Sequence, residues 1–408
     1  MRKALAGTNP AAEHLVESGP PGRIRSQAPV KSPDDGVRGG WGRMGVITGA
    51  ERLPENADMD PGALRHAVSL IEARGAIAQI RVLRYGQVVL DRAFGCRPDS
   101  LFLSFSAGKP FVATLVHQLA ERGTLDLDDP VARYWPEFGR RGKDTITIRQ
   151  VLQHRAGLPV AHSLPRDALA APHWGRAVRA LELAQPSWPP GEVPAYHILS
   201  FGFILGEVVQ RVTGADLREV MRAELLGPLG LADTYLGLPR AEWPRHVPVR
   251  GHGPVTLVRQ MVFNRRGIRA AVVPAATVST TAQDLTRFYQ MLLRGGEVDG
   301  VRVLRPETVA QATAPSANGE TDRLLRLPVR WSQGFQLGGP APDPRRPRPM
   351  GAASSPDAFG HNGSNCCLAW ADPSRGLVFA YLTNRLSTSF DGSPHQSQVS
   401  DAILTACR

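Results

Sequence analysis

The spacing of hydrophobic residues predicts that the folded part of the chain begins with a helix followed by a β-hairpin. Leu64, Val68 and Ile71 recur at helical intervals, and the pattern stops at a glycine. Two runs rich in Val, Ile and Leu then follow at 77–83 and 87–94, separated by an Arg-Tyr-Gly turn. Short strand-like runs this close together in the chain are typical of a hairpin.

The middle of the chain has a helical period, and strand-like runs return only near its end. Helices are expected at 106–122, 147–157, 175–185, 198–212, 216–226 and 281–294. The late strands are expected at 334–337, 365–371 and 377–383, before a closing helix at about 396–406.

This order of elements indicates an α/β protein of the α+β type. The simplest arrangement places the late strands beside the early hairpin in one antiparallel β-sheet flanked by the terminal helices, with a mainly helical second lobe. We therefore expect one domain over 51–408, with a sheet lobe at about 60–105 and 331–408 and a helical lobe at about 106–330. Active sites favour such boundaries between lobes.

Residues 1–50 differ from the rest of the chain. They are rich in Gly, Pro, Ser and charge without a sustained period, so we expect a disordered or loosely attached tail. The start is basic but lacks an apolar run of signal-peptide length. No segment approaches about 18 consecutive apolar residues, the length of a membrane span, and a cytoplasmic location is expected.

Composition and charge favour a globular protein. Hydrophobic residues make up 42% of the 408 residues, enough for a large core. The net charge of +11 raises the question of a nucleic acid or a membrane surface as partner. The arginines are scattered, however, and the densest basic cluster, at 345–348, lies in a proline-rich stretch. We therefore expect no nucleic acid and no membrane partner, and the oligomeric state is left open.

The cysteines predict neither disulfides nor a metal site. Cys96, Cys366, Cys367 and Cys407 form no spaced framework, and adjacent cysteines do not bridge without strain. No run of residues has the spacing of metal ligands. No metal and no other cofactor is expected.

The candidate chemistry lies at Ser106 and Lys109. On a helix, residues three apart have Cβ atoms about 5–6 Å from each other, so the amine of Lys109 can reach the hydroxyl of Ser106. A serine hydroxyl needs an adjacent base to attack at neutral pH. Lysine serves as that base when burial and positive potential lower its pKa. Pro110 supports a helix N-terminus here, where unpaired backbone N–H groups can bind an oxyanion.

The use of lysine elsewhere in the chain strengthens this interpretation. A Ser-x-x-Lys pattern is short and occurs by chance in many proteins. Of the 48 basic residues only four are lysines, so 44 are arginines. Lysine is therefore retained at position 109, where arginine, which does not deprotonate, would not serve as a base.

Three segments together resemble the motifs of the serine β-lactamase and penicillin-binding-protein superfamily. They are Ser106-Ala107-Gly108-Lys109, Tyr196-His197-Ile198 and His361-Asn362-Gly363. Connecting segments at 123–131, 148–158 and 371–373 match as well, so the resemblance covers about 60–405 in order. The most similar branch is the class C β-lactamase-like group with its carboxylesterases and transacylases, which implies a β-lactamase/transpeptidase-like fold.

The resemblance implies roles for six residues. Ser106 and Lys109 would be nucleophile and base, and Tyr196 would relay a proton to the leaving group. The N–H groups of Ser106 and Ser364 would form the oxyanion hole. Gly363 would let the acyl group approach the backbone, and His361 would hydrogen-bond the substrate or the tyrosine. Taken without the resemblance, Tyr196 is a loop residue and His361 only shapes the cleft.

Four further residues are interpreted as structural. His154 is expected on a short apolar helix, and Asn384 is expected to tie down a loop at a strand end. Cys366 and Cys367 are expected to be small buried strand residues.

Two departures from the β-lactamase pattern bear on the substrate. Ile198 stands where class C β-lactamases carry an asparagine that contacts the substrate amide. His361 stands where a lysine usually helps to hold the β-lactam carboxylate. Both changes remove polar recognition, and they favour the esterase-like members of the superfamily.

The sequence therefore predicts a serine hydrolase that forms an acyl-enzyme on Ser106 and most readily cleaves carboxylic esters. A transacylase that moves an acyl group to an alcohol or amine is the alternative, followed by a β-lactamase or D-alanyl peptidase. The alternative that is not an enzyme is a member of the superfamily without catalytic activity, which binds a ligand or a partner. The presence of Ser106, Lys109 and Tyr196 argues against this alternative.

Overall fold

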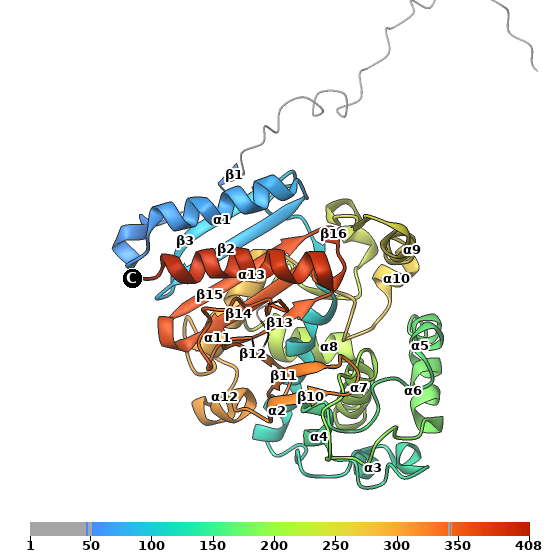
Figure 1. Cartoon of the computed structure of the whole chain (residues 1–408). Coiled ribbons are helices and arrows are strands. Elements are labelled where there is room, and N and C mark those ends of the chain that lie inside the picture. The colour runs from blue at the N-terminus through green and yellow to red at the C-terminus, as the bar shows by residue number, and fades with distance from the viewer. Residues whose placement is uncertain (1–45, 48–50, 342, 344) are drawn as a thin grey trace, which may run out of the picture. The chain divides into compact units, whose positions relative to one another are not determined.

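The computed structural model describes residues 46–47, 51–341, 343 and 345–408 of the chain (Figure 1). Most of the tail expected at 1–50 lies outside the described residues. The exception is β1 (Val46–Ile47), which pairs antiparallel with β3 (Gln87–Phe94). No helix in the described part is long and apolar enough to cross a bilayer.

One antiparallel sheet contains both the early hairpin and the late strands, as the sequence predicts. Its order is β1-β3-β2-β15-β14-β13-β12-β11-β10. β2 (Ala78–Arg84) pairs with β3 and, along its whole length, with β15 (Leu377–Thr383). The other strands are β10 (Ala317–Asp322), β11 (Leu327–Trp331), β12 (Gln336–Leu337), β13 (Phe359–Gly363) and β14 (Cys367–Asp372). The α+β fold class is confirmed.

The strands that the sequence located best are those with hydrophobic residues on both faces. All seven residues of β15 are buried because helices cover both sides of the sheet there, so the strand reads as an unbroken apolar run. β10 has the polar sequence Ala-Asn-Gly-Glu-Thr-Asp and is exposed at its four central positions. β10 and all but the last residue of β11 lie before residue 331, in the range that the sequence assigned to the helical lobe.

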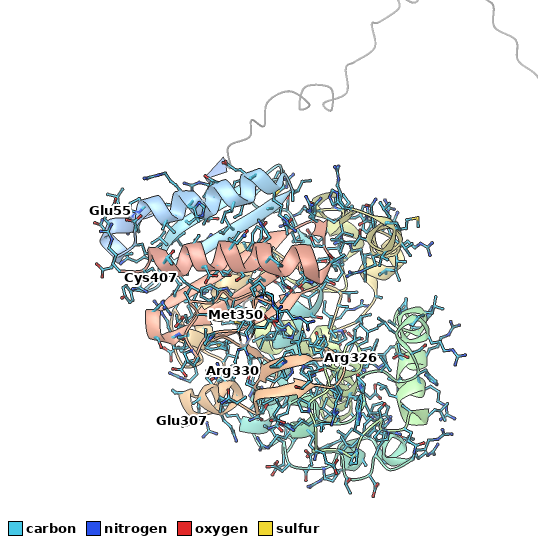
Figure 2. All side chains as sticks on the ribbon, in the orientation of Figure 1. Glu55, Glu307, Arg326, Arg330, Met350 and Cys407 are labelled. Carbon is cyan, nitrogen blue, oxygen red and sulfur yellow. The ribbon has the colours of Figure 1, made fainter. Side chains whose placement is uncertain are left out.

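The first and last helices cover one face of the sheet. α1 (Pro61–Arg74) and α13 (Ser389–Ala406) run side by side in Figure 1. α1 begins where the Asp60 side chain accepts the Ala63 N–H at 2.9 Å, and it ends at Gly75 with φ 64°. Cys407, labelled in Figure 2 after α13, forms a backbone bridge with Met59 ahead of α1. The segments around α1 and α13 therefore form one helical layer on this face of the sheet.

The opposite face packs on α11 and on the helical part of the chain. α11 (Ala282–Leu293) contacts β2, β14 and β15, and Thr281 caps it as expected by accepting the Asp284 N–H. The other helices are α2 (Lys109–Glu121), α3 (Val131–Tyr134), α4 (Ile148–Leu152), α5 (Leu164–Ala170), α6 (Trp174–Leu183), α7 (Ser200–Thr213), α8 (Leu217–Met221), α9 (Pro254–Phe263), α10 (Arg266–Ala270) and α12 (Pro306–Thr313). A large core joins these helices to the sheet.

Short strand pairs anchor the connections between the helices. β4 (Phe102–Leu103) and β5 (Tyr235–Leu236) both pair with β7 (Val278–Thr280). β6 (Arg250–Gly251) pairs in parallel with β16 (Arg385–Leu386), and β8 (Glu297–Val298) pairs with β9 (Val301–Arg302). β4 lies shortly before α2 in the chain, so its pairing with β7 ties the start of that helix to the later strands.

Three predicted helix boundaries are wrong. The closing helix expected at about 396–406 begins at Ser389. The other two differ for local reasons. The helix expected at 106–122 begins at Lys109, because residues 105–108 form a 3₁₀ turn. The helix expected at 147–157 ends at Leu152, because His154 and Gly157 both adopt positive φ. Its N-terminal prediction is confirmed, since Thr147 and Gln150 form a capping box.

Candidate active site

Ser106 lies in the 3₁₀ turn η3 (Phe105–Gly108), between β4 and α2. Phe105, the residue before it, has φ 51°, in the left-handed region that bulky side chains rarely adopt. Its buried ring meets Phe263 edge to face, with centroids 4.9 Å apart. Backbone strain of this kind persists where the surroundings determine the conformation, and it often marks a functional site.

Strand β7 fixes the position of the turn η3 through hydrogen bonds and close packing. The backbone N–H and the hydroxyl of Ser104 both donate to the carbonyl of Val278 at 2.9 Å. Gly108 approaches the same residue so closely that an added Cβ would lie 2.8 Å from Val278 Cβ. The position of Ser106 is therefore set by contacts with a strand more than 150 residues later in the sequence.

Lys109 places its amine at the centre of the site. Its Nζ lies 3.1 Å from the Ser106 hydroxyl, 2.8 Å from the Tyr196 hydroxyl and 2.9 Å from the carbonyl of Ile198. The side chain is fully buried, and this burial lowers the pKa of the Lys109 amine well below its usual value of 10.5. A neutral amine has a lone pair that can accept the serine proton.

Tyr196 is the third member of this cluster. Its ring stacks on Trp331 at a centroid distance of 5.3 Å and an interplanar angle of 7°. Burial raises the pKa of the Tyr196 phenol, whereas a hydrogen bond with Ser106 lowers it. The phenol is therefore protonated at neutral pH and able to donate a proton. The second motif thus lies where the resemblance placed it.

His154 and Asp322 hold the aromatic pair in place. The His154 ring meets Tyr196 at 4.9 Å and Trp331 at 4.8 Å, and its Nδ1 accepts the His197 N–H at 3.2 Å. Burial lowers the pKa of His154 well below 6.5, so the ring is neutral. The buried carboxylate of Asp322 accepts the Trp331 indole N–H at 3.3 Å. His154 follows α4 instead of lying on it as expected, and it packs directly against Tyr196.

His361 presents an acceptor to the site. Its Nδ1 lies 2.8 Å from the carbonyl of Asn362, which can only accept, so Nδ1 carries the proton. Its Nε2 is buried without a partner among the described residues, and the ring centroid lies 6.2 Å from that of Tyr196. Burial, together with the nearby Lys109, lowers the pKa of His361 to about 3. The ring is therefore neutral at physiological pH, unlike the lysine that it replaces.

Gly363 brings the end of β13 against the turn that carries Ser106. An added Cβ would overlap the carbonyl oxygen of Ser104 and lie 3.1 Å from the Ala107 nitrogen. The close approach that requires glycine here is between two parts of the backbone, and the expectation that Gly363 lets an acyl group approach stays a prediction. Ser364 follows at φ 54°, next to the turn that carries Ser106.

β13, the strand that carries the third motif, has a neighbouring strand along only part of its length. β12 pairs with β13 only at Phe359 and Gly360. Beyond that point, the Asn362 N–H donates to the Gln336 side chain at 2.8 Å. The part of β13 that contains His361 and Gly363 therefore lies past the end of its neighbouring strand.

We expect Gly363→Ala to lower kcat/KM for a p-nitrophenyl ester at least about tenfold and to lower the melting temperature. The overlap is with backbone, so no side-chain rotation relieves it, and β13 must move away from Ser106. Ester turnover and thermal unfolding by circular dichroism measure the two effects. Gly175→Ala is the matched control, because an added Cβ there contacts nothing within 4 Å. Full activity in Gly363→Ala would show that this approach does not position the site.

Arg259, from α9, reaches the same strand end. Its guanidinium donates to the Ser364 hydroxyl. In the described residues it forms no ion pair with a carboxylate. Sequence reasoning did not identify this residue, since nothing in its local pattern distinguishes it from the other arginines.

The remaining structural expectations are largely confirmed. Cys366 and Cys367 are both buried, but only Cys367 lies in a strand, because Cys366 belongs to the turn between β13 and β14. The Cys367 thiol lies 3.3 Å from the carbonyl of Leu103, just before the turn that carries Ser106. Asn384 accepts the Ile77 N–H at 3.2 Å and donates to the Pro248 carbonyl at 3.0 Å, which ties a loop to the end of β15.

A cavity of about 560 Å³ lies elsewhere in the described part of the chain. It is lined by the C-terminal end of α2 and neighbouring charged residues, without Ser106, Lys109 or Tyr196. Its lining contains no lysine and no cysteine. Among the residues that the structure describes, no three His, Cys, Asp or Glu side chains gather as a metal site.

Comparisons with known proteins agree with this geometry. A family model described as Beta-lactamase matches residues 68–402. Esterase/beta-lactamase LipL of Mycobacterium tuberculosis is 32% identical over 325 residues, which cover 71% of this chain and 70% of that protein. The crystal structure of a family VIII carboxylesterase is similar with a TM-score of 0.74 and 28% identity, over 85% of this chain and 98% of that one. A penicillin-binding-protein homologue from Caulobacter crescentus gives a TM-score of 0.72 at 28% identity, over 85% and 98% of the two chains.

Proposed function

Because the chain belongs to the beta-lactamase family, we propose that it hydrolyses carboxylic esters through an acyl-enzyme on Ser106. The observation that carries this proposal is the contact of one fully buried amine, that of Lys109, with the hydroxyls of both Ser106 and Tyr196. The similar proteins described as an esterase and a carboxylesterase support the ester as substrate.

Acylation follows from the proton positions. Lys109 takes the Ser106 proton as the serine oxygen bonds to the ester carbonyl carbon, and the charge that develops on the carbonyl oxygen faces the N–H groups of Ser106 and Ser364. As the bond to the leaving oxygen breaks, Tyr196 gives that oxygen a proton and receives one from Lys109, 2.8 Å away. Lys109 is then neutral again, and the alcohol leaves.

Deacylation reverses these transfers with a new nucleophile. Water gives a proton to the Tyr196 and Lys109 pair, attacks the acyl carbon and releases the acid, while Ser106 recovers its proton from Lys109. The unpartnered Nε2 of His361 is an acceptor that can orient an O–H group of the attacking molecule. An alcohol satisfies the same acceptor, so acyl transfer is the second candidate.

The site favours β-lactam or D-alanyl peptide substrates less than esters. In the third motif a substrate carboxylate would meet the neutral His361 in place of a lysine, although Arg259, which donates to Ser364, supplies a cation at the end of that strand. At position 198 the isoleucine side chain has no amide that could contact a substrate, and only its backbone carbonyl takes part in the site, by accepting from Lys109. A cytoplasmic location, expected from the sequence, stays a prediction.

Intact-protein mass spectrometry tests the proposal. The folded protein is mixed with a fluorophosphonate, p-nitrophenyl butyrate, an acyl thioester or a chromogenic cephalosporin. We expect the fluorophosphonate and the ester to modify Ser106, and free acid to be the main product when an alcohol is added as competitor. A predominance of the new ester would favour the transacylase. Absence of any label on Ser106 in folded protein would remove the enzymatic proposal.

A further inference from the structure

The outward face of α9 is apolar. Val255 is 72% exposed, Leu257 47%, Val258 57% and Met261 60%. With 3.6 residues per turn, these four side chains point to one side of the helix, and no charged residue lies between them on that side. In Figure 1, α9 lies away from the large sheet, next to β16.

The polar side chains of α9 point inward. Gln260 accepts the Gly251 N–H at 2.7 Å, and the buried Thr256 donates to the carbonyl of Gly253 at 3.1 Å. Arg259 reaches inward to the hydroxyl of Ser364. A surface helix of a water-soluble domain has the opposite arrangement, with its apolar side toward the core. The orientation of α9 therefore fits an apolar environment outside the protein.

Basic residues flank this face, and acidic residues are missing from the segment. Residues 243–283 contain no Asp or Glu. Arg250 is exposed before the helix, and Arg265 and Arg266 are exposed after it. None of these three arginines has an ion-pair partner among the residues that the structure describes.

We propose that α9 docks on the surface of an anionic lipid bilayer. Its apolar residues would enter the boundary between headgroups and acyl chains, and Arg250, Arg265 and Arg266 would contact anionic headgroups. A second copy of the chain fits this face poorly, because a two-fold contact would bring the same arginines together without carboxylates in the segment. The sequence alone predicted no membrane partner because the arginines looked scattered, and the outward direction of the apolar residues is visible only in the fold.

The docked orientation would bring the active site to the lipid. Arg259 connects α9 to Ser364, and Phe263 at the end of α9 contacts Phe105 beside Ser106. Substrates dissolved in the bilayer would then enter the site from the side of α9. Binding to lipid is measured without ester turnover, so its outcome is independent of the proposed hydrolysis.

Vesicle flotation with the full-length chain tests the docking. We expect binding at least about tenfold tighter to vesicles of phosphatidylcholine with phosphatidylglycerol than to phosphatidylcholine alone, and weaker binding as salt is raised. The double variant Val258→Glu/Met261→Glu should lose at least about tenfold in affinity, and Arg265→Gln/Arg266→Gln should lose part of it. The matched control is Leu169→Glu, which alters a side chain that is 78% exposed on α5 and should bind as the wild type does.

Three results would overturn the proposal. Unchanged binding of Val258→Glu/Met261→Glu would assign the affinity to another part of the chain. An equal loss in Leu169→Glu would show that any added negative charge has the same effect. A wild-type dimer that this double variant converts to a monomer, without wild-type vesicle binding, would assign the face to a second copy. Circular dichroism and turnover of a soluble ester confirm that each variant is folded.

Discussion

Ser106→Ala is expected to reduce kcat/KM for p-nitrophenyl butyrate by at least about 10³-fold, because no other hydroxyl occupies the position from which the acyl group is attacked. Lys109 and Tyr196 remain in place in this variant, but they have no nucleophile to deprotonate. Spectrophotometric release of p-nitrophenol measures the loss, and a melting temperature close to that of the wild type shows that the fold is kept.

Ser104→Ala is the informative control for this variant. It removes a buried hydroxyl two residues away that donates to Val278, which weakens the support of the turn without removing the nucleophile. We expect Ser104→Ala to be less stable but still labelled by fluorophosphonate. A Ser106→Ala protein that retains more than about a tenth of the wild-type rate would rule out Ser106 as the nucleophile.

Lys109→Met is expected to lower kcat/KM about 10²- to 10⁴-fold, the range associated with loss of a general base. Methionine fills the buried space but cannot accept the Ser106 proton. Lys109→Arg should be similarly impaired, because a guanidinium stays protonated. In the wild type, activity should rise with pH through the lowered pKa of Lys109 and reach a plateau below pH 10.5.

Stability provides a second measurement on the same variant. The unfolded chain binds a proton at Lys109 up to about pH 10.5, whereas the folded protein has lost it at lower pH. Protonation therefore favours the unfolded state, and the contribution of Lys109 to stability falls as the pH decreases from 10.5 toward its folded pKa. We expect the melting temperature of Lys109→Met at neutral pH to be no lower than that of the wild type. A flat pH–rate profile together with nearly full activity in Lys109→Met would exclude lysine as the base.

The parts of the site that sequence reasoning identified are those encoded within a few residues. Ser106 and Lys109 are three positions apart, and Lys109 is one of only four lysines among 48 basic residues. Tyr196 and His361 were reached only through the resemblance, since neither has a local pattern that indicates catalysis. In the structure the centroids of their rings lie 6.2 Å apart.

The features that sequence reasoning missed depend on contacts between distant segments. Trp331 stacks on Tyr196 from the end of a strand pair that begins in a polar stretch without hydrophobic alternation. The left-handed Phe105 is fixed by packing on Phe263, far along the chain. Periodicity predicts that one face of a helix is apolar, but it does not say whether that face is turned toward the core, as α9 shows.

The assembly of the site from both ends of the chain has a consequence for how the protein is made. Ser104, two residues before Ser106, donates to β7, Tyr196 stacks on Trp331 of β11, and Gly363 of β13 packs against the same turn. A chain still emerging from the ribosome can form α2 early, but these three strands are synthesised much later. The contacts around Ser106, Lys109 and Tyr196 are therefore complete only after β13 has been synthesised, and the proposed activity is expected only from a chain that has reached that strand.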